Sequence, residues 1–274
     1  MGGGGYNIRV AKLKASTDYS TKSREEVFSQ RNLDPLMDPK RAEIRESRDS
    51  DEHPESFPII IALDETGSMG HIPEKLIKDI FPDIMEKILN AGVPNPQVLF
   101  MGIGDCCYNE QAPLQVGQFE SSDELMEKWL TKIYLEGRGG GNRHESYPLA
   151  WYFAHRHVVT DAWEKRKVKG VLITIGDEPC QRLLTKEQLN KYVDNAQADV
   201  TISELLPEVQ RYWNVFHIHC EGSHSYSFKE TNWEQLLGIN AVVSEDHDGS
   251  DIAEIIPKLV ISCYNQRNIE SVEE

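Results

Sequence analysis

The sequence predicts a three-layer α/β/α sandwich built around a mostly parallel sheet. Three short apolar runs, at residues 58–63, 97–103 and 170–175, have the unbroken apolar character of strands that are buried on both faces. Segments with helical periodicity stand between these runs. Strands that alternate with helices are typical of parallel sheets covered by helices on both sides, so we expect that architecture here.

The segment 74–89 has the clearest helical pattern, because apolar pairs recur along it every four residues. Pro82 lies inside the segment and is expected to kink the helix, since proline has no N–H for the bond to residue i−4. A second helix, expected at 145–157, is apolar almost all round and should therefore be deeply buried.

The remaining elements follow from shorter patterns of the same two kinds. An edge strand is expected at 114–119, and further strands at 214–219 and 241–243. Further helices are expected at 122–134, 186–195, 202–212, 233–237 and 250–265. The last of these repeats apolar residues along one face, as a helix does when it closes a core.

The chain divides by composition into three parts. Residues 1–56 form a charged N-terminal arm, in which nine of the thirteen residues from Lys40 to Glu52 are charged. Residues 57–266 form the α/β domain, and residues 267–274 an acidic C-terminal tail. We expect the arm either to be flexible and solvated or to lie along the domain or a neighbouring subunit.

The bulk composition excludes several classes of partner. Acidic residues outnumber basic ones by 45 to 29, for a formal charge of −16, so nucleic acid is not an expected partner. No apolar run approaches the length of a membrane span, and no apolar signal segment is present. The five cysteines are scattered and lack CxxC spacing, which is typical of reduced thiols. We therefore expect a cytoplasmic protein without membrane or nucleic-acid partners.

Oxygen donors gather after three of the predicted elements. Asp64, Thr66 and Ser68 stand at every second residue directly after the first strand. A glycine-rich loop contains Asn142 and leads to Glu145, and Asp177 follows the strand at 170–175. Because the carboxyl ends of parallel strands meet at one edge of a sheet, these side chains are expected to converge. Oxygen donors in such a turn suit a small hard cation such as Mg²⁺.

Residues 57–265 resemble the von Willebrand factor A domain, with its Rossmann-like sheet and metal-ion-dependent adhesion site. Asp64, Thr66 and Ser68 match the Asp-x-Ser/Thr-x-Ser motif of that family, and Asp177 matches the aspartate that ends a buried strand. The family variant with Asp or Asn followed three residues later by Glu maps onto Asn142 and Glu145. Many members carry a threonine ligand in this loop, and none occurs here between residues 132 and 159.

Which of Asn142 and Glu145 takes the threonine's place stays open, although a carboxylate is the stronger donor for Mg²⁺. The ending Asp177-Glu178-Pro179-Cys180 and the charged arm are similar to phage-encoded or bacterial stand-alone members of the family.

The resemblance implies a protein-binding module and not an enzyme. In the family's scheme the two hydroxyls bind Mg²⁺, or Mn²⁺ in its place, and the aspartates act through water. A partner's Asp or Glu carboxylate then completes the coordination. The chain would serve as an adaptor or assembly factor, with an AAA+ ATPase or a second copy of itself among the expected partners.

Two alternatives to this interpretation remain. In a structural homo-oligomer, the acidic arm would bind the metal edge of a neighbouring copy. A Mg²⁺-dependent phosphohydrolase of the haloacid dehalogenase type would need a second aspartate where Thr66 stands, so an enzyme is disfavoured.

Two further groups of residues are not expected to bind the metal. His217 and His219 share a strand face, but no regular fourth ligand accompanies them, so a zinc site is not expected there. Asp105 is expected to cap the loop that follows it.

Overall fold

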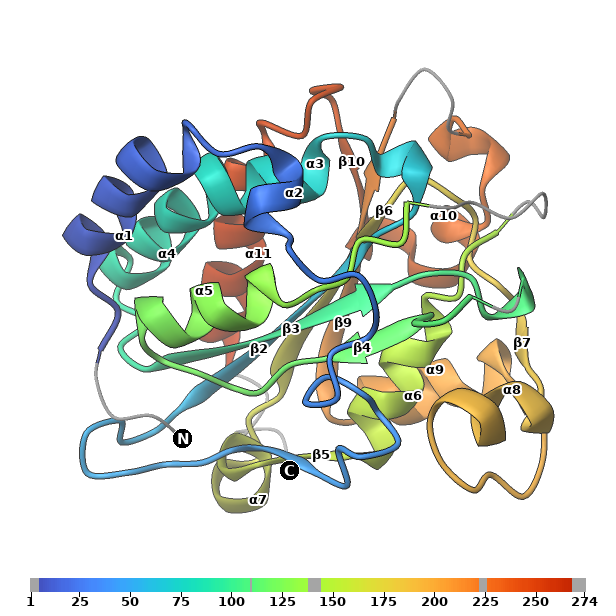
Figure 1. Cartoon of the computed structure of the whole chain (residues 1–274). Helices are drawn as coiled ribbons and strands as arrows, with labels where there is room; N and C mark the ends of the chain where they lie inside the picture. The colour runs from blue at the N-terminus through green and yellow to red at the C-terminus, as the bar shows by residue number, and fades with distance from the viewer. Residues whose placement is uncertain (1–4, 109, 138–143, 222–225, 268–274) are drawn as a thin grey trace.

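A six-stranded mixed sheet forms the centre of the molecule. The computed structural model describes residues 5–108, 110–137, 144–221 and 226–267. The strand order is β10-β9-β6-β2-β3-β4, and only the β3–β4 pair is antiparallel. The strands are β2 (Phe57–Asp64), β3 (Pro96–Ile103), β4 (Leu114–Val116), β6 (Gly170–Gly176), β9 (Trp213–Cys220) and β10 (Ala241–Ser244). The predicted fold class, an α/β sandwich around a mostly parallel sheet, is confirmed (Figure 1).

Helices cover both faces of the sheet (Figure 1). One face carries α4 (Phe81–Asn90), α5 (Asp123–Thr131) and α11 (Ile252–Gln266). The other carries α6 (Pro148–Arg156), α8 (Lys186–Tyr192), α9 (Ile202–Gln210) and α10 (Trp233–Leu237). Successive residues of β2 feed the two cores in turn: Ile59 and Ile61 point into the first, and Ile60 into the second. An unbroken apolar run is therefore what this strand requires.

Shorter elements connect these layers. They are β1 (Arg45–Ser47), β5 (Val158–Thr160), β7 (Leu183–Leu184), β8 (Val200–Thr201), α1 (Ile8–Lys14), α2 (Arg24–Val27), α3 (Ile72–Lys75) and α7 (Asp161–Arg166). Single π-helical turns occupy Ala15–Tyr19 and Leu76–Ile80. The second of these turns divides the predicted helix at 74–89, and Pro82 lies in the first turn of α4, where its missing N–H costs nothing.

The predicted helix at 145–157 begins later than expected, at Pro148. Glu145 instead forms an isolated bridge with Cys180, with its N–H donating to Pro179 O at 3.0 Å. The backbone at Glu145 is thus held in an extended pairing and is not free to enter the helix. This difference matters for the site, because it fixes Glu145 beside the loop that follows β6.

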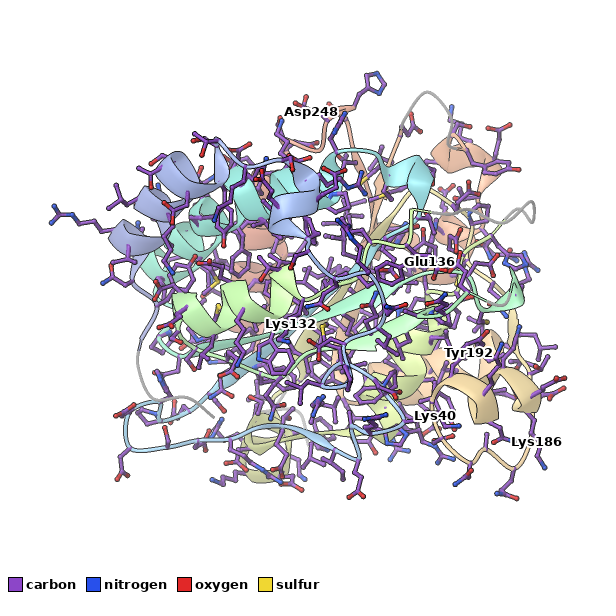
Figure 2. The ribbon with its side chains drawn as sticks, viewed as in Figure 1. Lys40, Lys132, Glu136, Lys186, Tyr192 and Asp248 are labelled. Carbon is purple, nitrogen blue, oxygen red and sulfur yellow. The ribbon has the colours of Figure 1, made fainter. Side chains whose placement is uncertain are left out.

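Residues 5–56 pack against their own sandwich. α1 lies on α4 and α5, where Lys12 Nζ is 2.8 Å from Asp83 Oδ1. Further along, Met37 is fully buried, and Asp34 pairs with Lys132, the C-cap residue of α5, which is labelled in Figure 2. β1 pairs in parallel with β5, outside the main sheet. A few apolar anchors and many ion pairs thus hold a segment whose composition is typical of a solvated chain.

Asp49 carries one of these ties. Its carboxylate accepts hydrogen bonds from both Arg166 terminal nitrogens, at 2.6 and 3.1 Å. Ser56 N and Oγ both donate to the same carboxylate at 2.9 Å. The positive charge of Arg166 and the bonds from Ser56 outweigh the effect of burial and hold the pKa of Asp49 well below its usual range.

In the described ranges, no helix combines the length and the apolar character needed to cross a bilayer.

Candidate metal centre

Asp64 and Asp177 meet at the point where the strand order reverses. Asp64 ends β2, Asp177 follows β6, and these two strands are parallel neighbours with Leu63 paired to Ile175. Strands added after β2 extend the sheet towards β4, and strands added after β6 extend it towards β10. The connections therefore diverge here, and open α/β sheets bind their ligands at such a position. Both carboxylates are buried, with side chains 0% and 2% exposed.

A chain of hydrogen bonds joins the two carboxylates through two hydroxyls. Thr66 N and Thr66 Oγ1 donate to Asp64 Oδ1 at 2.9 and 2.6 Å. Thr66 Oγ1 and Ser68 Oγ are 3.1 Å apart, and Ser68 Oγ donates to Asp177 Oδ1 at 3.0 Å. Four of the six side chains predicted for the site are therefore linked in one hydrogen-bonded series.

Accessibility differs sharply along this chain of bonds. Asp64, Thr66 and Asp177 are buried, whereas Ser68 is exposed. Ser68 and Asp177 also line a cavity of about 370 Å³, together with residues of the turns after β9 and β10. An ion held at the hydroxyls would therefore face the protein's acids on one side and an open cavity on the other.

Glu145 lies near this group, and Asn142 lies outside the described residues. The Glu145 side chain is 4% exposed, and its Oε2 has no hydrogen-bond partner in the part of the chain that the structure describes. Burial, with repulsion chiefly from Asp64, raises the pKa of Glu145 to about 11. Its backbone accepts a bond from Gln181 N at 3.1 Å, which ties it to the loop after Asp177. The assignment of the remaining ligand to Glu145 or Asn142 stays a prediction.

Close glycine contacts bring the three segments of the site together. A Cβ at Gly67 would stand 2.9 Å from Gly137 O. The backbone of the turn after β2 therefore packs directly against the backbone at Gly137. A Cβ at Gly176 would stand 2.0 Å from Tyr147 Oη. The strand β6 therefore needs glycine at this position for the tyrosine hydroxyl to reach the site.

Tyr147 is a member of the site that the sequence did not indicate. Its hydroxyl donates to Asp64 Oδ2 at 2.8 Å and accepts from Glu178 N at 3.3 Å. Its ring packs edge-on against His217 and Trp233, with centroids 5.2 Å away in each case. A buried tyrosine is most often a core residue. The one signal for a role of Tyr147 in the site is Gly176, because a residue without a side chain leaves room for the tyrosine hydroxyl. Tyr147 fixes Asp64 Oδ2, while the Thr66 bonds fix Oδ1.

His217 and His219 pack among aromatic side chains of the core. His217 stacks on Trp233 with ring centroids 3.5 Å apart and bonds to Thr174 Oγ1 through Nδ1 at 2.9 Å. His219 Nε2 bonds to Tyr226 O at 2.8 Å. Burial lowers the pKa of both rings, well below the usual value for His217, so both are neutral rings at physiological pH.

Further buried carboxylates surround the predicted ligands. Glu65, Asp105 and Glu110 are buried and Glu178 is half-buried, and each has a buried oxygen with no hydrogen-bond partner among the described residues. Burial is the main cause that raises the pKa of Glu110 and of Glu178 to about 7, and it raises the pKa of Asp177 to about 8. The pKa of Asp64 is raised by burial too. Acids that are buried together raise each other's pKa when no cation stands among them.

A divalent cation fits this arrangement. Within the described ranges, no salt bridge to a lysine, arginine or histidine involves Asp64, Glu145 or Asp177. Buried carboxylates without a positive partner are costly, and a bound cation would supply the missing charge. The donors around Asp64 are oxygens only, which favours a hard ion of the Mg²⁺ type. The hydroxyls of Thr66 and Ser68 would hold it, with the carboxylates of Asp64 and Asp177 close by and Glu145 or Asn142 as the further predicted ligand.

A scan against protein-family models and a search of curated proteins found no match. Solved structures that resemble the chain include the open form of the pilus adhesin SpaC from Lactobacillus rhamnosus GG, at 11% identity and a TM-score of 0.48, covering 79% of this chain and 31% of that one. Proximal thread matrix protein 1 from the mussel byssus has 13% identity and a TM-score of 0.46, covering 75% and 46%.

A von Willebrand factor type A structure from Catenulispora acidiphila has 12% identity and a TM-score of 0.44, covering 76% of this chain and 42% of that one. The chain thus spans between about a third and a half of the length of these three structures. Solved structures similar to this chain therefore include von Willebrand factor A domains. Identities and TM-scores this low assign neither a family nor an activity.

Proposed function

We propose that this chain is a Mg²⁺-dependent protein-binding module that captures a carboxylate of its partner. The observation that carries the proposal is the hydrogen-bonded series Asp64–Thr66–Ser68–Asp177, which is buried at one end and exposed at Ser68. Mn²⁺ has similar ligand preferences and is expected to replace Mg²⁺.

The ligands leave part of the positive charge of the ion unneutralised. Thr66 and Ser68 are neutral, so an ion held by their hydroxyls keeps more of its charge than one enclosed by carboxylates. Hard cations take further oxygen ligands from outside when the protein leaves positions to water. A partner's Asp or Glu side chain supplies such an oxygen with a negative charge.

The cavity beside Ser68 suits an approach by a protein side chain. It is about 370 Å³ in volume and includes His71 and His247 in its lining. Both line the cavity together with Asp177 and Ser68, and the exposed ring of His71 can donate to a partner's carboxylate. The net charge of −16 repels acidic surfaces, so the chain does not attract them nonspecifically. Binding of an acidic residue would therefore depend on the ion, which makes recognition conditional on the metal.

A role as an adaptor or assembly factor follows from this mode of binding. One metal-bridged carboxylate is a small contact, and it gives specificity only when the surrounding surface also fits the partner. Among the described acids, Asp64 is fully buried and bonded at both oxygens. A nucleophilic or acid–base role requires a carboxylate that reaches substrate, so we propose no such role for Asp64.

Affinity capture tests the proposal. The full-length chain and its Ser68→Ala variant are immobilised and exposed to host lysate with Mg²⁺ or with chelator, and retained proteins are identified by mass spectrometry. We expect proteins that are retained only by the unmodified chain with Mg²⁺, and that are lost when lysate carboxylates are first amidated. Retention that is equal with chelator, or equal in Ser68→Ala, would contradict it. Asp64-dependent hydrolysis of a phosphate ester would favour an enzyme instead.

A further inference from the structure

A second cluster of ligand-type side chains lies outside the Asp64 group. Asp105, Cys107 and His144 each bring one ligand atom to within 4.8 Å of the other two. Asp105 comes from the loop after β3, with Cys107 two residues further on, and His144 stands next to Glu145. Oxygen, sulfur and nitrogen donors therefore meet at one place, in contrast to the oxygen donors around Asp64.

The two segments that carry these residues are fixed to each other. Cys106 N donates to Ser146 Oγ at 3.0 Å, and Ser146 N donates to Gly104 O at 3.3 Å. Cys107 N donates to Asp105 Oδ1 at 2.8 Å, so one oxygen of Asp105 caps the loop, as sequence reasoning expected. Hydrogen bonds of the backbone thus fix the positions of these residues, in addition to side-chain packing.

The other oxygen of Asp105 is the observation that points to a ligand. The Asp105 side chain is 0% exposed, and its Oδ2 has no hydrogen-bond partner in the described part of the chain. A buried carboxylate oxygen without a donor is costly. Cys107 Sγ and a ring nitrogen of His144 lie within 4.8 Å of a carboxylate oxygen of Asp105, and thiolate and imidazole are groups that bind transition metals well.

We propose that Asp105, Cys107 and His144 bind a Zn²⁺ ion at a site separate from the Mg²⁺ centre. A thiolate, an imidazole and a carboxylate form a ligand set that suits Zn²⁺ and not Mg²⁺. Ligand atoms lie about 3.5 Å apart around a tetrahedral ion with bonds of about 2.0–2.3 Å. The present spacing of up to 4.8 Å therefore needs a small closure, which the exposed Cys107 side chain provides by rotation.

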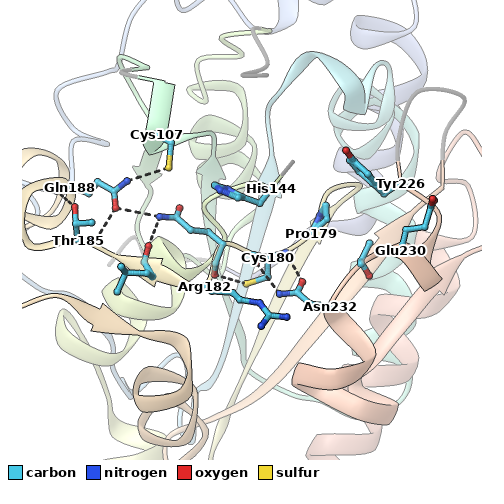
Figure 3. A pocket seen from close by; sticks show the side chains of 13 residues that line it. Cys107, His144, Pro179, Cys180, Arg182, Thr185, Gln188, Tyr226, Glu230 and Asn232 are labelled. Carbon is cyan, nitrogen blue, oxygen red and sulfur yellow. Dashed lines mark hydrogen bonds between the residues drawn. The ribbon is translucent and has the colours of Figure 1, made fainter. Parts of the chain in front are cut away.

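Three protein ligands leave the fourth position of a tetrahedral ion open. Cys107 and His144 both line a cavity of about 680 Å³, which also includes Arg182 and Asn232 (Figure 3). The open position of the ion faces this cavity and would take water or a donor group of a bound molecule. Gln188 Nε2 donates to Cys107 Sγ at 3.3 Å, a bond that favours the thiolate form that metals require.

Cobalt spectroscopy on the full-length chain tests this site. Chelator-treated protein in a thiol-free reductant is titrated with Co²⁺, whose thiolate complexes have a strong near-ultraviolet charge-transfer band. We expect a band that saturates at one Co²⁺ per chain, is removed by an equivalent of Zn²⁺, and resists an excess of Mg²⁺. Cys107→Ser should remove the band, and His144→Ala should weaken Co²⁺ binding at least 10-fold.

Two control variants separate this site from other thiols and from the Mg²⁺ centre. Cys263→Ser changes a thiol on α11 and Asp64→Asn changes the Mg²⁺ centre, so both should keep the band. A missing band, or a band that persists in Cys107→Ser, would overturn the proposal. Loss of the band in Asp64→Asn would overturn the separation of the two sites. The Mg²⁺ centre is measured independently by calorimetry, so either site can fail alone.

Discussion

Ser68 Oγ donates to Asp177 Oδ1 at 3.0 Å and thereby joins the turn after β2 to the loop after β6. The bond crosses the point where the strand order of the sheet reverses. Ser68 is exposed and Asp177 is buried, so the pair connects the surface to a group of acids that form no salt bridge within the described ranges. The proposed ion would lie at this connection.

Asp64→Asn should abolish Mg²⁺ binding and leave the fold intact. The amide keeps an acceptor for the Thr66 bonds but removes a buried negative charge, so the thermal midpoint of the metal-free protein should stay equal or rise. Isothermal titration calorimetry with Mg²⁺ and thermal melts would measure both effects. Asp248→Asn is the matched control, because Asp248 lies at the rim of the same cavity and pairs with Lys75 (Figure 2). Equal Mg²⁺ affinity in the unmodified chain and Asp64→Asn would reject the site.

Tyr147→Phe should weaken Mg²⁺ binding about 10-fold, as outer partners of metal ligands do. It leaves Asp64 Oδ2 without its donor, so the free energy of unfolding should also fall by about 1–3 kcal/mol. Calorimetry and urea denaturation give the two numbers. Tyr152→Phe removes a hydroxyl that bonds to Asp194 away from the site, and should leave Mg²⁺ affinity unchanged. An equal loss of Mg²⁺ affinity in Tyr147→Phe and Tyr152→Phe would show that Tyr147 acts only through core packing.

Gly176→Ala should displace Tyr147 and lower stability. The new Cβ would stand 2.0 Å from the Tyr147 hydroxyl and 2.6 Å from its ring, and overpacking of this kind costs about 1–3 kcal/mol. Mg²⁺ affinity should fall with it, because the donor to Asp64 moves. Urea denaturation and calorimetry test both, and an unchanged Mg²⁺ affinity would separate the glycine from the site.

The metal-free protein should lose stability as pH rises from about 5 to 9. The folded-state pKa of Asp177 is about 8 against an ordinary value of 3.8, and that of Glu178 about 7 against 4.5. Acids with a raised folded pKa contribute stability below their unfolded pKa, and this stability is lost as pH rises through the folded value. Mg²⁺ needs the ionised acids, so its stabilisation should grow over the same range.

Thermal melts with Mg²⁺ and with chelator, at several pH values, check this prediction. The gap between the two melting temperatures should widen from pH 5 to pH 9. A gap that is constant or that narrows would mean that these carboxyl groups do not hold the ion.

Arg166→Ala should loosen the N-terminal segment. It leaves the Asp49 carboxylate without its two arginine bonds, and loss of bonds to a charged group costs about 1–3 kcal/mol. Hydrogen exchange should rise at β1 and the residues beside it. Arg211→Ala removes an exposed pair with Glu208 and should change stability by less than about 1 kcal/mol. Equal effects of the two variants would show that the Asp49 tie is not structural.

The fold was predictable because its strands obey a simple rule. A strand buried on both faces is mostly apolar, and β2, β3 and β6 are unbroken buried runs of this kind, each ending in an aspartate or followed by one within two residues. The contact of Asp64, Thr66 and Ser68 followed from their spacing in one turn. Their meeting with Asp177 followed from the rule that parallel strands end at one edge.

The rest of the site depends on contacts that no local pattern records. The helix expected at Glu145 starts three residues later because Glu145 pairs with Cys180, far along the chain. Tyr147 joins the site only because Gly176 leaves room for its hydroxyl. His144 and Asp105 come together through bonds made by Ser146. Asn142 lies outside the described residues, so its predicted role still rests on sequence alone.

Anomalous scattering from a Mn²⁺-soaked crystal of the full-length protein tests the central claim most directly. We predict a manganese peak bonded to the hydroxyl oxygens of Thr66 and Ser68, close to Asp64 and Asp177, with a coordination position open towards the cavity beside Ser68. A crystal with manganese bound elsewhere, and none between these hydroxyls and carboxylates, would contradict the account.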